Sequence, residues 1–326
     1  MRKKRSNTIA CVMALAAVAT GQTPARPRID GISHVTFFVH DVTAARNYYQ
    51  SFLGYAHPFA VTSGDSQTVM TVVRINDRQY VELVPERAAA GDRLATIALQ
   101  TDDAEAMRIY LKSRGVAVPD KVGTDRLENI SFDVTDPDGH VVSIVQYKPN
   151  GWMRVATGTV SRSAAISIDM RHAGILVGAL QPAMAFYRDV LGFNEIWRGS
   201  RDAQELNWVN MRVPDGQDYI EFMLYRDLPE PSKRGTQHHI CLVVPDIETS
   251  LATLRERASA TGYTRAMEIR AGTNRKRQLN LYDPDGTRVE LMEPTTIDGK
   301  PTPSSAAPPK YRFTPSTPAD RTGPCS

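Results

Sequence analysis

The chain of 326 residues is long enough for two domains of ordinary size with tails. Its 41% hydrophobic and 23% charged residues are typical of a globular protein. The formal net charge of +3 includes four cations at the start, Arg2 to Arg5, and without them 35 basic residues (39 − 4) face 36 acidic ones. This near-neutral balance excludes a general electrostatic attraction to nucleic acid or to an anionic membrane.

The first 22 residues have the organisation of a secretory signal peptide. The basic start is followed by an apolar stretch, Ile9 to Ala19, which ends in small residues. This stretch is too short to cross a bilayer as a helix. We therefore expect residues 1–22 to be removed on export and the mature protein to be periplasmic or secreted, without membrane insertion.

A repeated pattern organises the rest of the chain. A strand at Ile32–Val39 leads into a helix that stops at Gly54, and a strand at Arg171–Val177 leads into a helix that stops at Gly192. Each glycine stands where a helix end favours positive φ. Each unit closes with an Asp-Pro-Asp-Gly turn, at 136–139 and 283–286, followed by an apolar strand.

Each unit divides again into two strand–helix openings. A strand at Leu94–Leu99 precedes a helix around 104–113, and a strand at His238–Val244 precedes a helix that runs to about Ala258, with aspartates as helix caps. The pattern predicts four βαβββ modules. We expect domains at 30–148 and 170–294, a linker at 149–169, and a disordered tail rich in Pro, Ser and Thr at 295–326.

Four segments in this order resemble the vicinal oxygen chelate superfamily of glyoxalases, bleomycin resistance proteins and extradiol dioxygenases. They are HVTFFVHD (34–41), FYRDVLGF (186–193), HHICLVVPD (238–246) and DPDGTRVEL (283–291). The resemblance implies an α+β fold in which tandem paired βαβββ modules form curved mixed sheets around a metal and substrate cavity.

The resemblance also implies four metal-ligand positions per domain. The second domain has a complete set there: His172, Glu221, His239 and Glu290. The first domain has His34 and Glu82 but Thr96 and Ser143 at the other two positions, so its site is expected to be degenerate. Pairing of modules across domains would instead combine His34 and Glu82 with His239 and Glu290. His238 has the opposite strand parity to His239 and is expected to face away.

The residue types support a metal site independently of the resemblance. Imidazoles and carboxylates are ligands for one divalent ion, here Zn, Ni, Mn or Fe(II), and a carboxylate within an apolar strand is costly to bury unless it is paired or metal-bound. The basic run Asn274–Arg277 has two interpretations, an anion site or a solvated loop. Trp208 and Tyr219 could line the cavity or pack in the core.

Three functions remain open from the sequence. A metal-dependent lyase or isomerase of glyoxalase type would act on a small oxygen-rich substrate through a metal-stabilised enolate, with Glu221 and Glu290 as catalytic candidates. A ring-cleaving dioxygenase is disfavoured, because the resemblance leads us to expect a Tyr at the place of Asn280 and a His upstream of it. A small-molecule-sequestering protein without chemistry is the third. We expect a small-molecule substrate, no nucleic acid, and a monomer or homodimer.

Overall fold

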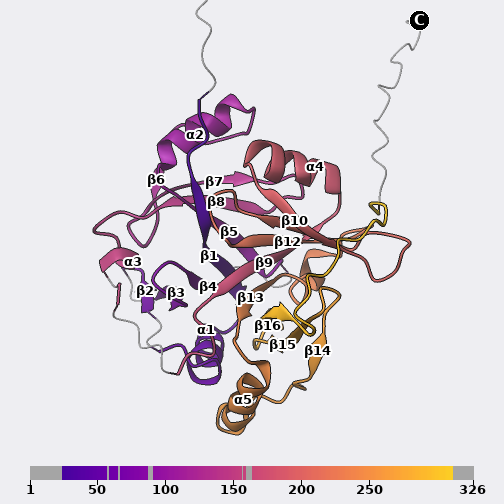
Figure 1. Ribbon diagram of the computed structural model, residues 1–326. Coiled ribbons are helices and arrows are strands. Elements are labelled where there is room, and N and C mark those ends of the chain that lie inside the picture. Colours follow the sequence, from indigo (N-terminus) through magenta and orange to yellow (C-terminus); the bar gives the residue numbers. More distant parts are fainter. Residues whose placement is uncertain are drawn as a thin grey trace, which may run out of the picture.

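The computed structural model describes residues 24–56, 59–64, 67–86, 91–155, 157–158 and 164–310. Two curled eight-stranded mixed sheets make up the molecule (Figure 1). The first sheet has the order β2-β3-β4-β1-β5-β8-β7-β6. Its strands are β1 (Ile29–Val39), β2 (Phe59–Thr62), β3 (Thr68–Arg74), β4 (Tyr80–Pro85), β5 (Leu94–Thr101), β6 (Gly123–Thr124), β7 (Ile130–Thr135) and β8 (Val141–Gln146).

The second sheet repeats this order as β10-β11-β12-β9-β13-β16-β15-β14. Its strands are β9 (Met170–Val177), β10 (Asn194–Gly199), β11 (Trp208–Arg212), β12 (Tyr219–Leu224), β13 (His239–Val243), β14 (Ile269–Ala271), β15 (Lys276–Tyr282) and β16 (Arg288–Thr296). In each sheet two βαβββ modules join through their first strands, β1 with β5 and β9 with β13. Each sheet therefore pairs two modules from one half of the chain, and we call the two halves the first and second domains.

Each module has a helix after its first strand, and two further short helices lie between modules. They are α1 (Val42–Asn47) with the π-helix η1 (Tyr48–Phe52), α2 (Ala104–Ser113), α3 (Trp152–Val155), α4 (Leu180–Met184) with the π-helix η2 (Ala185–Val190), the 3-10 turn η3 (Pro231–Lys233) and α5 (Ile247–Thr261). The side chains of Asp103 and Asp246 accept hydrogen bonds at the starts of α2 and α5, as expected from the sequence. Gly54 and Gly192 have φ of +82° and +80° after the π-helices, again as expected.

Strand alternation separates the core from the cavities. Along β1, Val35 and Phe37 are fully buried in one large hydrophobic cluster that also contains Tyr49 of η1 and Met107 of α2. His34 and Thr36, which alternate with them along the strand, point to the opposite face of the sheet, because successive strand residues alternate. The helices thus cover one face of each sheet, and the polar cavity lies on the other.

The two domains share this core and a polar seam. The cluster contains residues of both sheets, and Phe52 of η1 stacks on Tyr263 beyond α5 with ring centroids 4.2 Å apart. The Asp218 carboxylate, which is buried, accepts hydrogen bonds from Arg78 at 2.7 Å and from the Ile32 backbone N–H at 2.9 Å. Figure 1 shows α2 beside α4 at one end and α1 near α5 at the other.

The segment after Thr295 differs from the expected disordered tail. Strand β16 runs to Thr296, and residues up to Lys310 lie against the second domain. The Leu206 N–H donates to the Pro308 carbonyl at 2.8 Å, and the Ser305 N–H donates to the Arg198 carbonyl at 2.9 Å. Prolines lack an N–H but keep a carbonyl acceptor, so a Pro-rich strap can dock by its carbonyls and by the buried Ala307. Composition alone did not reveal these partners.

The expected linker also contains order. Helix α3 lies within it, and its end is fixed by Ser167, whose hydroxyl donates to the Val243 carbonyl at 2.6 Å. The predicted signal peptide lies outside the described residues. Within the residues that the structure describes, no helix has the length and hydropathy of a membrane span.

Candidate metal centre

Four adjacent strands of the second sheet each contribute one donor side chain. Glu221 lies on β12, His172 on β9, His239 on β13 and Glu290 on β16, in the spatial order β12-β9-β13-β16. Gly174 on β9 makes room for this arrangement, because a Cβ there would lie 1.9 Å from Cε1 of His239. The equivalent residue in the first domain is Thr36, whose side chain would occupy the place that the His239 imidazole takes over Gly174 in the second sheet.

The donor atoms converge on the imidazole of His239. Its Nε2 lies 3.1 Å from Nε2 of His172, 3.6 Å from a Glu221 oxygen and 3.7 Å from a Glu290 oxygen. His172 and His239 are each 1% exposed and Glu290 is 5% exposed. His172, Glu221 and His239 each offer a ligand atom within 4.8 Å of the others.

Burial sets the protonation of this cluster. It lowers the pKa of both histidines well below the usual value, assisted by the positive charge of Arg288, so both imidazoles are neutral. Burial and the adjacent Glu290 carboxylate raise the pKa of Glu221 to about 8, and burial also raises the pKa of Glu290. Two neutral imidazoles and two carboxyl groups in a dry site form a donor set that fits a divalent cation.

The ring tautomer of His239 agrees with this fit. Its Nδ1 lies 2.9 Å from the Gln237 carbonyl oxygen, where a ring N–H donates. With the proton on Nδ1, Nε2 carries the free lone pair and faces His172 and both glutamates. A hydrogen bond from the outer ring nitrogen to a carbonyl is the usual way in which a ligand histidine is oriented.

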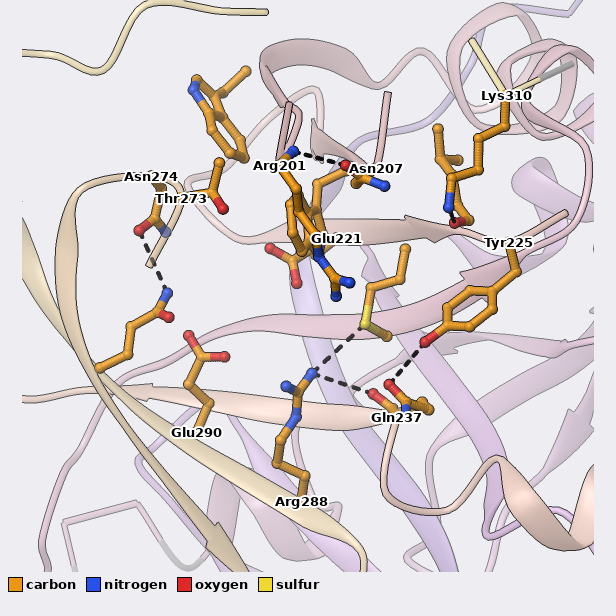
Figure 2. A pocket seen from close by; sticks show the side chains of 15 residues that line it. Arg201, Asn207, Glu221, Tyr225, Gln237, Thr273, Asn274, Arg288, Glu290 and Lys310 are labelled. Carbon is orange, nitrogen blue, oxygen red and sulfur yellow. Dashed lines mark hydrogen bonds between the residues drawn. The ribbon is translucent and has the colours of Figure 1, made fainter. Parts of the chain in front are cut away.

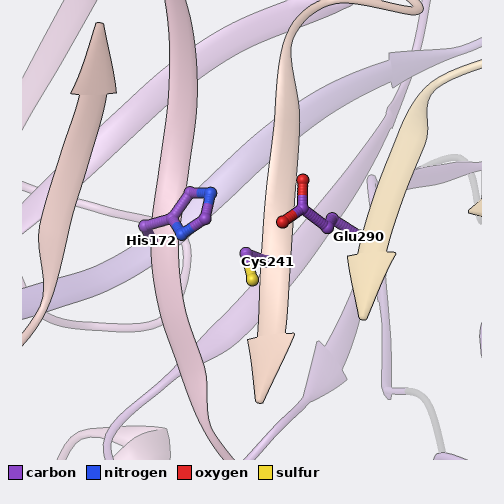
Figure 3. Close-up of side chains that lie close together, drawn as sticks. All are labelled: His172, Cys241 and Glu290. Atoms are coloured by element: carbon purple, nitrogen blue, oxygen red, sulfur yellow. The ribbon is translucent and has the colours of Figure 1, made fainter. Parts of the chain in front are cut away.

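Sequence reasoning missed two residues of this site. Cys241 lies between His172 and Glu290 in register, and the three offer ligand atoms within 4.8 Å of one another (Figure 3). Arg288 lies on β16 two residues before Glu290 and lines the same pocket. Strand parity could have indicated both residues. Cys241 is two residues from His239 and Arg288 is two residues from Glu290, and residues two apart on a strand share a face of the sheet.

The pocket beside the donor set has a volume of about 210 Å³. This is less than the roughly 300–1,000 Å³ of sites for drug-sized ligands, so the pocket fits a small molecule. Glu221, Glu290 and Trp208 are among its lining residues (Figure 2). Tyr219 instead packs on His172, with ring centroids 4.5 Å apart.

The first domain replaces a donor set with internal hydrogen bonds. His34 and Glu82 lie 3.7 Å apart in a separate cavity that Thr96 and Ser143 also line. The Thr36 hydroxyl donates to Glu82 at 2.7 Å, and the Ser143 hydroxyl donates to Asp133. The structure therefore brings His172, Glu221, His239 and Glu290 together, and it does not bring His34 and Glu82 to His239 and Glu290.

The remaining sequence candidates lie outside this centre. His238 faces away from the cavity, as expected, with Nδ1 3.2 Å from an Asp92 oxygen. In the basic run, Arg275 pairs with Asp298 at 2.5 Å and Arg277 pairs with Glu293 at 2.6 Å. These partners make the arginines of the run surface ion pairs, while Asn274 lines the pocket.

Comparison with known proteins agrees with the duplicated fold. The profile of the Glyoxalase/Bleomycin resistance protein/Dioxygenase superfamily matches residues 31–144 and 169–291. The chain belongs to this superfamily. The two matched stretches correspond to the two sheets, so the family resemblance seen in the sequence is confirmed, and so is the fold of paired βαβββ modules.

Individual relatives cover one or both domains. An uncharacterised protein of Escherichia coli (strain K12), YaeR, is 28% identical over 131 residues, which are 38% of this chain and 95% of that protein. The 2,3-dioxygenase LapB from Pseudomonas sp. KL28 superposes with a TM-score of 0.64 at 14% identity, covering 86% of this chain and 99% of that one. The Mn(II)-bound glyoxalase from Novosphingobium aromaticivorans gives 0.62 at 17% identity, covering 86% and 89%.

Proposed function

We propose that the protein is a divalent-metal-dependent lyase or isomerase of glyoxalase type, acting on a small oxygen-rich substrate. The observation that carries this proposal is the convergence of two neutral imidazoles and two carboxyl groups beside a small pocket in the second domain. A metal bound there would polarise vicinal substrate oxygens and stabilise an enolate. The similarity to a Mn(II)-bound glyoxalase supports the metal dependence of the fold family.

The residues of this chain supply binding and proton transfer. His172 and His239 are held neutral by burial, so that their nitrogens are available as ligands without loss of a proton. Glu221 lines the pocket, and its carboxylate, ionised once a metal is bound, would lie where it can take a proton from a carbon acid. Glu290 completes the set from β16, and it is the second candidate for the base.

A ring-cleaving dioxygenase is the alternative that the fold similarity favours, because extradiol enzymes are among the similar structures. At these identities the likeness shows the fold alone. Asn280 pairs with Glu290 across β15 and β16, where the sequence led us to expect a tyrosine in such an enzyme. Oxygen consumption with catechols by the Fe(II)-reconstituted protein would decide for the dioxygenase.

Metal content of four purified variants tests the proposed site. His239→Ala and Glu290→Ala each remove a donor of the buried set, and affinity should fall by more than the roughly 10–100-fold lost when a ligand-supporting residue is removed. His172→Ala should have the same effect, since its Nε2 lies 3.1 Å from that of His239.

His34→Ala is the matched control, because it removes the equivalent histidine of the other sheet. It should leave one metal per chain by elemental analysis. A full metal equivalent in His239→Ala would exclude this site, and loss of metal in His34→Ala would instead support pairing across the domains. Full metal without turnover of any carbon acid would favour a sequestering protein.

A further inference from the structure

The pocket of the second domain contains an excess of cationic groups. Arg201, Arg288 and Lys310 line it together with two carboxyl groups, Glu221 and Glu290 (Figure 2). They come from different parts of the chain: Arg201 follows β10, Arg288 lies on β16, and Lys310 belongs to the C-terminal strap. We call these three residues the cationic wall.

Arg288 is a partly buried member of the wall and has few acceptors. Its Nη2 lies 3.3 Å from the Gln237 carbonyl oxygen and 3.6 Å from the Met223 sulfur. Its Nε is buried and has no hydrogen-bond partner. Among the described residues no carboxylate forms an ion pair with Arg288. A guanidinium has five N–H donors, so most of its capacity is unused.

His239 does not supply the missing acceptor for the Arg288 guanidinium. Nη2 of Arg288 lies 2.5 Å from Nδ1 of His239. In the tautomer that leaves Nε2 free, Nδ1 carries a hydrogen and donates it to the Gln237 carbonyl. A nitrogen that donates in this way cannot also accept from the guanidinium. Nη2 also lies 3.3 Å from Nε2 of His239, but a metal bound there would take that lone pair. In the metal-loaded site Arg288 would then be a cation beside a donor, with an anion as its favourable partner.

The charges of the donor set lead to the same conclusion. A divalent ion, two neutral imidazoles and two carboxylates sum to zero, so they leave no negative charge to balance Arg288. Arg201 packs over the Trp208 ring at 5.3 Å and forms no ion pair within the described chain. Lys310 donates to the Leu224 carbonyl at 2.8 Å and lies 3.9 Å from a Glu205 oxygen. Lys310 therefore has an anionic partner, whereas Arg288, with its buried Nε, has none in the described part of the chain, and a buried cation without an anion is costly to desolvate.

We propose that the pocket binds a small organic carboxylate, with the carboxylate group of the substrate paired to the guanidinium of Arg288. The planar fork of a guanidinium matches the two oxygens of a carboxylate. Arg201 and Lys310 extend the positive potential along the pocket wall. The volume of about 210 Å³ suits a compact hydroxy or keto acid. This inference rests on the proposed metal-dependent function, because the charge balance includes the metal.

The test compares two probes of nearly equal shape on the metal-loaded protein. Lactate carries a carboxylate beside a hydroxyl, and lactamide keeps both oxygens without the charge. Isothermal titration calorimetry should show lactate binding at least tenfold more tightly than lactamide, with a difference that shrinks as salt is raised. Equal affinities of the two probes would overturn the proposal, and tighter binding of methylphosphonate than of lactate would overturn the choice of a carboxylate.

Two variants localise the effect. Arg288→Gln should weaken lactate binding at least tenfold while elemental analysis still shows one metal per chain. Arg275→Gln is the control, since Arg275 is an exposed arginine paired with Asp298 outside the pocket, and it should change lactate affinity less than twofold. Unchanged lactate affinity in Arg288→Gln with full metal would overturn the inference. Loss of metal from the unmutated protein would instead count against the proposed function. Equal affinities of lactate and lactamide would overturn the inference even if Arg288→Gln does not fold. A preference for lactate is assigned to Arg288 by the variant, because a bound metal also favours a carboxylate over an amide.

Discussion

At the scale of single residues, burial sets the protonation of the side chains that would bind the metal. The histidines are already neutral because burial lowers their pKa, whereas Glu221 holds a proton up to about pH 8 in the metal-free protein. A proton must therefore leave a carboxyl group before that oxygen can serve as a ligand. This makes metal affinity depend on pH through the glutamates and not through the histidines.

We expect the apparent metal affinity to rise with pH up to about 8 and to level off above it. The pKa of Glu221 is raised in the folded state, so the proton is bound below pH 8 and is lost as the pH increases through that value. Each carboxyl that releases a proton contributes about tenfold per pH unit. Metal titrations at pH 6, 7, 8 and 9 in a non-chelating buffer measure this slope. Affinity that is constant between pH 6 and 8 would show that Glu221 is already ionised.

The same shift affects the stability of the metal-free protein. The unfolded chain loses the Glu221 proton near the ordinary glutamate pKa of about 4.3, and the folded chain keeps it to about 8. Between these values the folded state binds more protons, so this group makes the free energy of unfolding fall as the pH rises. Its effect has the opposite sign to that of an ion-paired carboxylate.

The four donors could be predicted from the sequence because they occupy matching places in a repeated unit. The sequence predicted one complete set per chain, because Thr96 and Ser143 of the first domain cannot replace an imidazole and a carboxylate. Cys241 and Arg288 were not recognised, since a cysteine in an apolar strand and an arginine after a turn have no chemical signature until the strands are paired. The strand register places Cys241 opposite both His172 and Glu290, and this register is known only from the folded structure.

At the scale of the elements, the glycines with positive φ differ in what surrounds them. Gly54 has φ of +82°, and a Cβ there would lie 2.0 Å from the Ala164 carbonyl oxygen. Gly139 has φ of +90° in its turn, with open space around the Cβ position. The sequence predicted the positive φ at the helix ends from the repeat, but not the contact with the linker, which joins residues far apart in the chain.

We expect Gly54→Ala to destabilise the protein more than Gly139→Ala. The control substitution has only the cost of a left-handed conformation, about 1–2 kcal/mol. Gly54→Ala adds a clash with backbone, and overpacking of this kind costs about 1–3 kcal/mol more. Urea unfolding followed by circular dichroism measures both. Equal losses would mean that the linker moves away from Gly54 at little cost.

At the scale of the whole molecule, the seam between the domains joins them into one unit. Asp218 of the second domain is 1% exposed and depends on Arg78 of the first. A Cβ at Gly31 would lie 2.3 Å from an Asp218 oxygen, so the glycine permits this close approach. The sequence predicted two similar domains and their order along the chain, but the surfaces on which they meet are specified by contacts between distant residues.

We expect one cooperative unfolding transition for the chain and a specific effect of Arg78→Ala. Loss of Arg78 leaves a buried carboxylate short of a donor, which costs about 1–3 kcal/mol. Arg275→Ala removes an exposed ion pair and should change the free energy of unfolding by less than about 1 kcal/mol. Calorimetry of the full chain gives both results. Two separate transitions would show that the seam does not couple the domains.

Export is the remaining proposal for the whole chain. We expect protein purified from the native host to begin between Thr20 and Arg26, because the small residues at the end of the apolar stretch form a cleavage site. N-terminal sequencing measures this. Soluble protein that retains Met1 in the cytoplasm would contradict it.

The unequal cavities give this chain an internal reference. Of its seven histidines, His34 and His172 occupy equivalent places in two copies of one scaffold, but only His172 lies beside a complete donor set. In an NMR spectrum of histidine-labelled protein, a paramagnetic ion such as Co(II) should shift or broaden the signal of His172 and leave that of His34 unchanged. Temperature, pH and solvent act on both, so the difference between the two signals would isolate the metal within a single molecule.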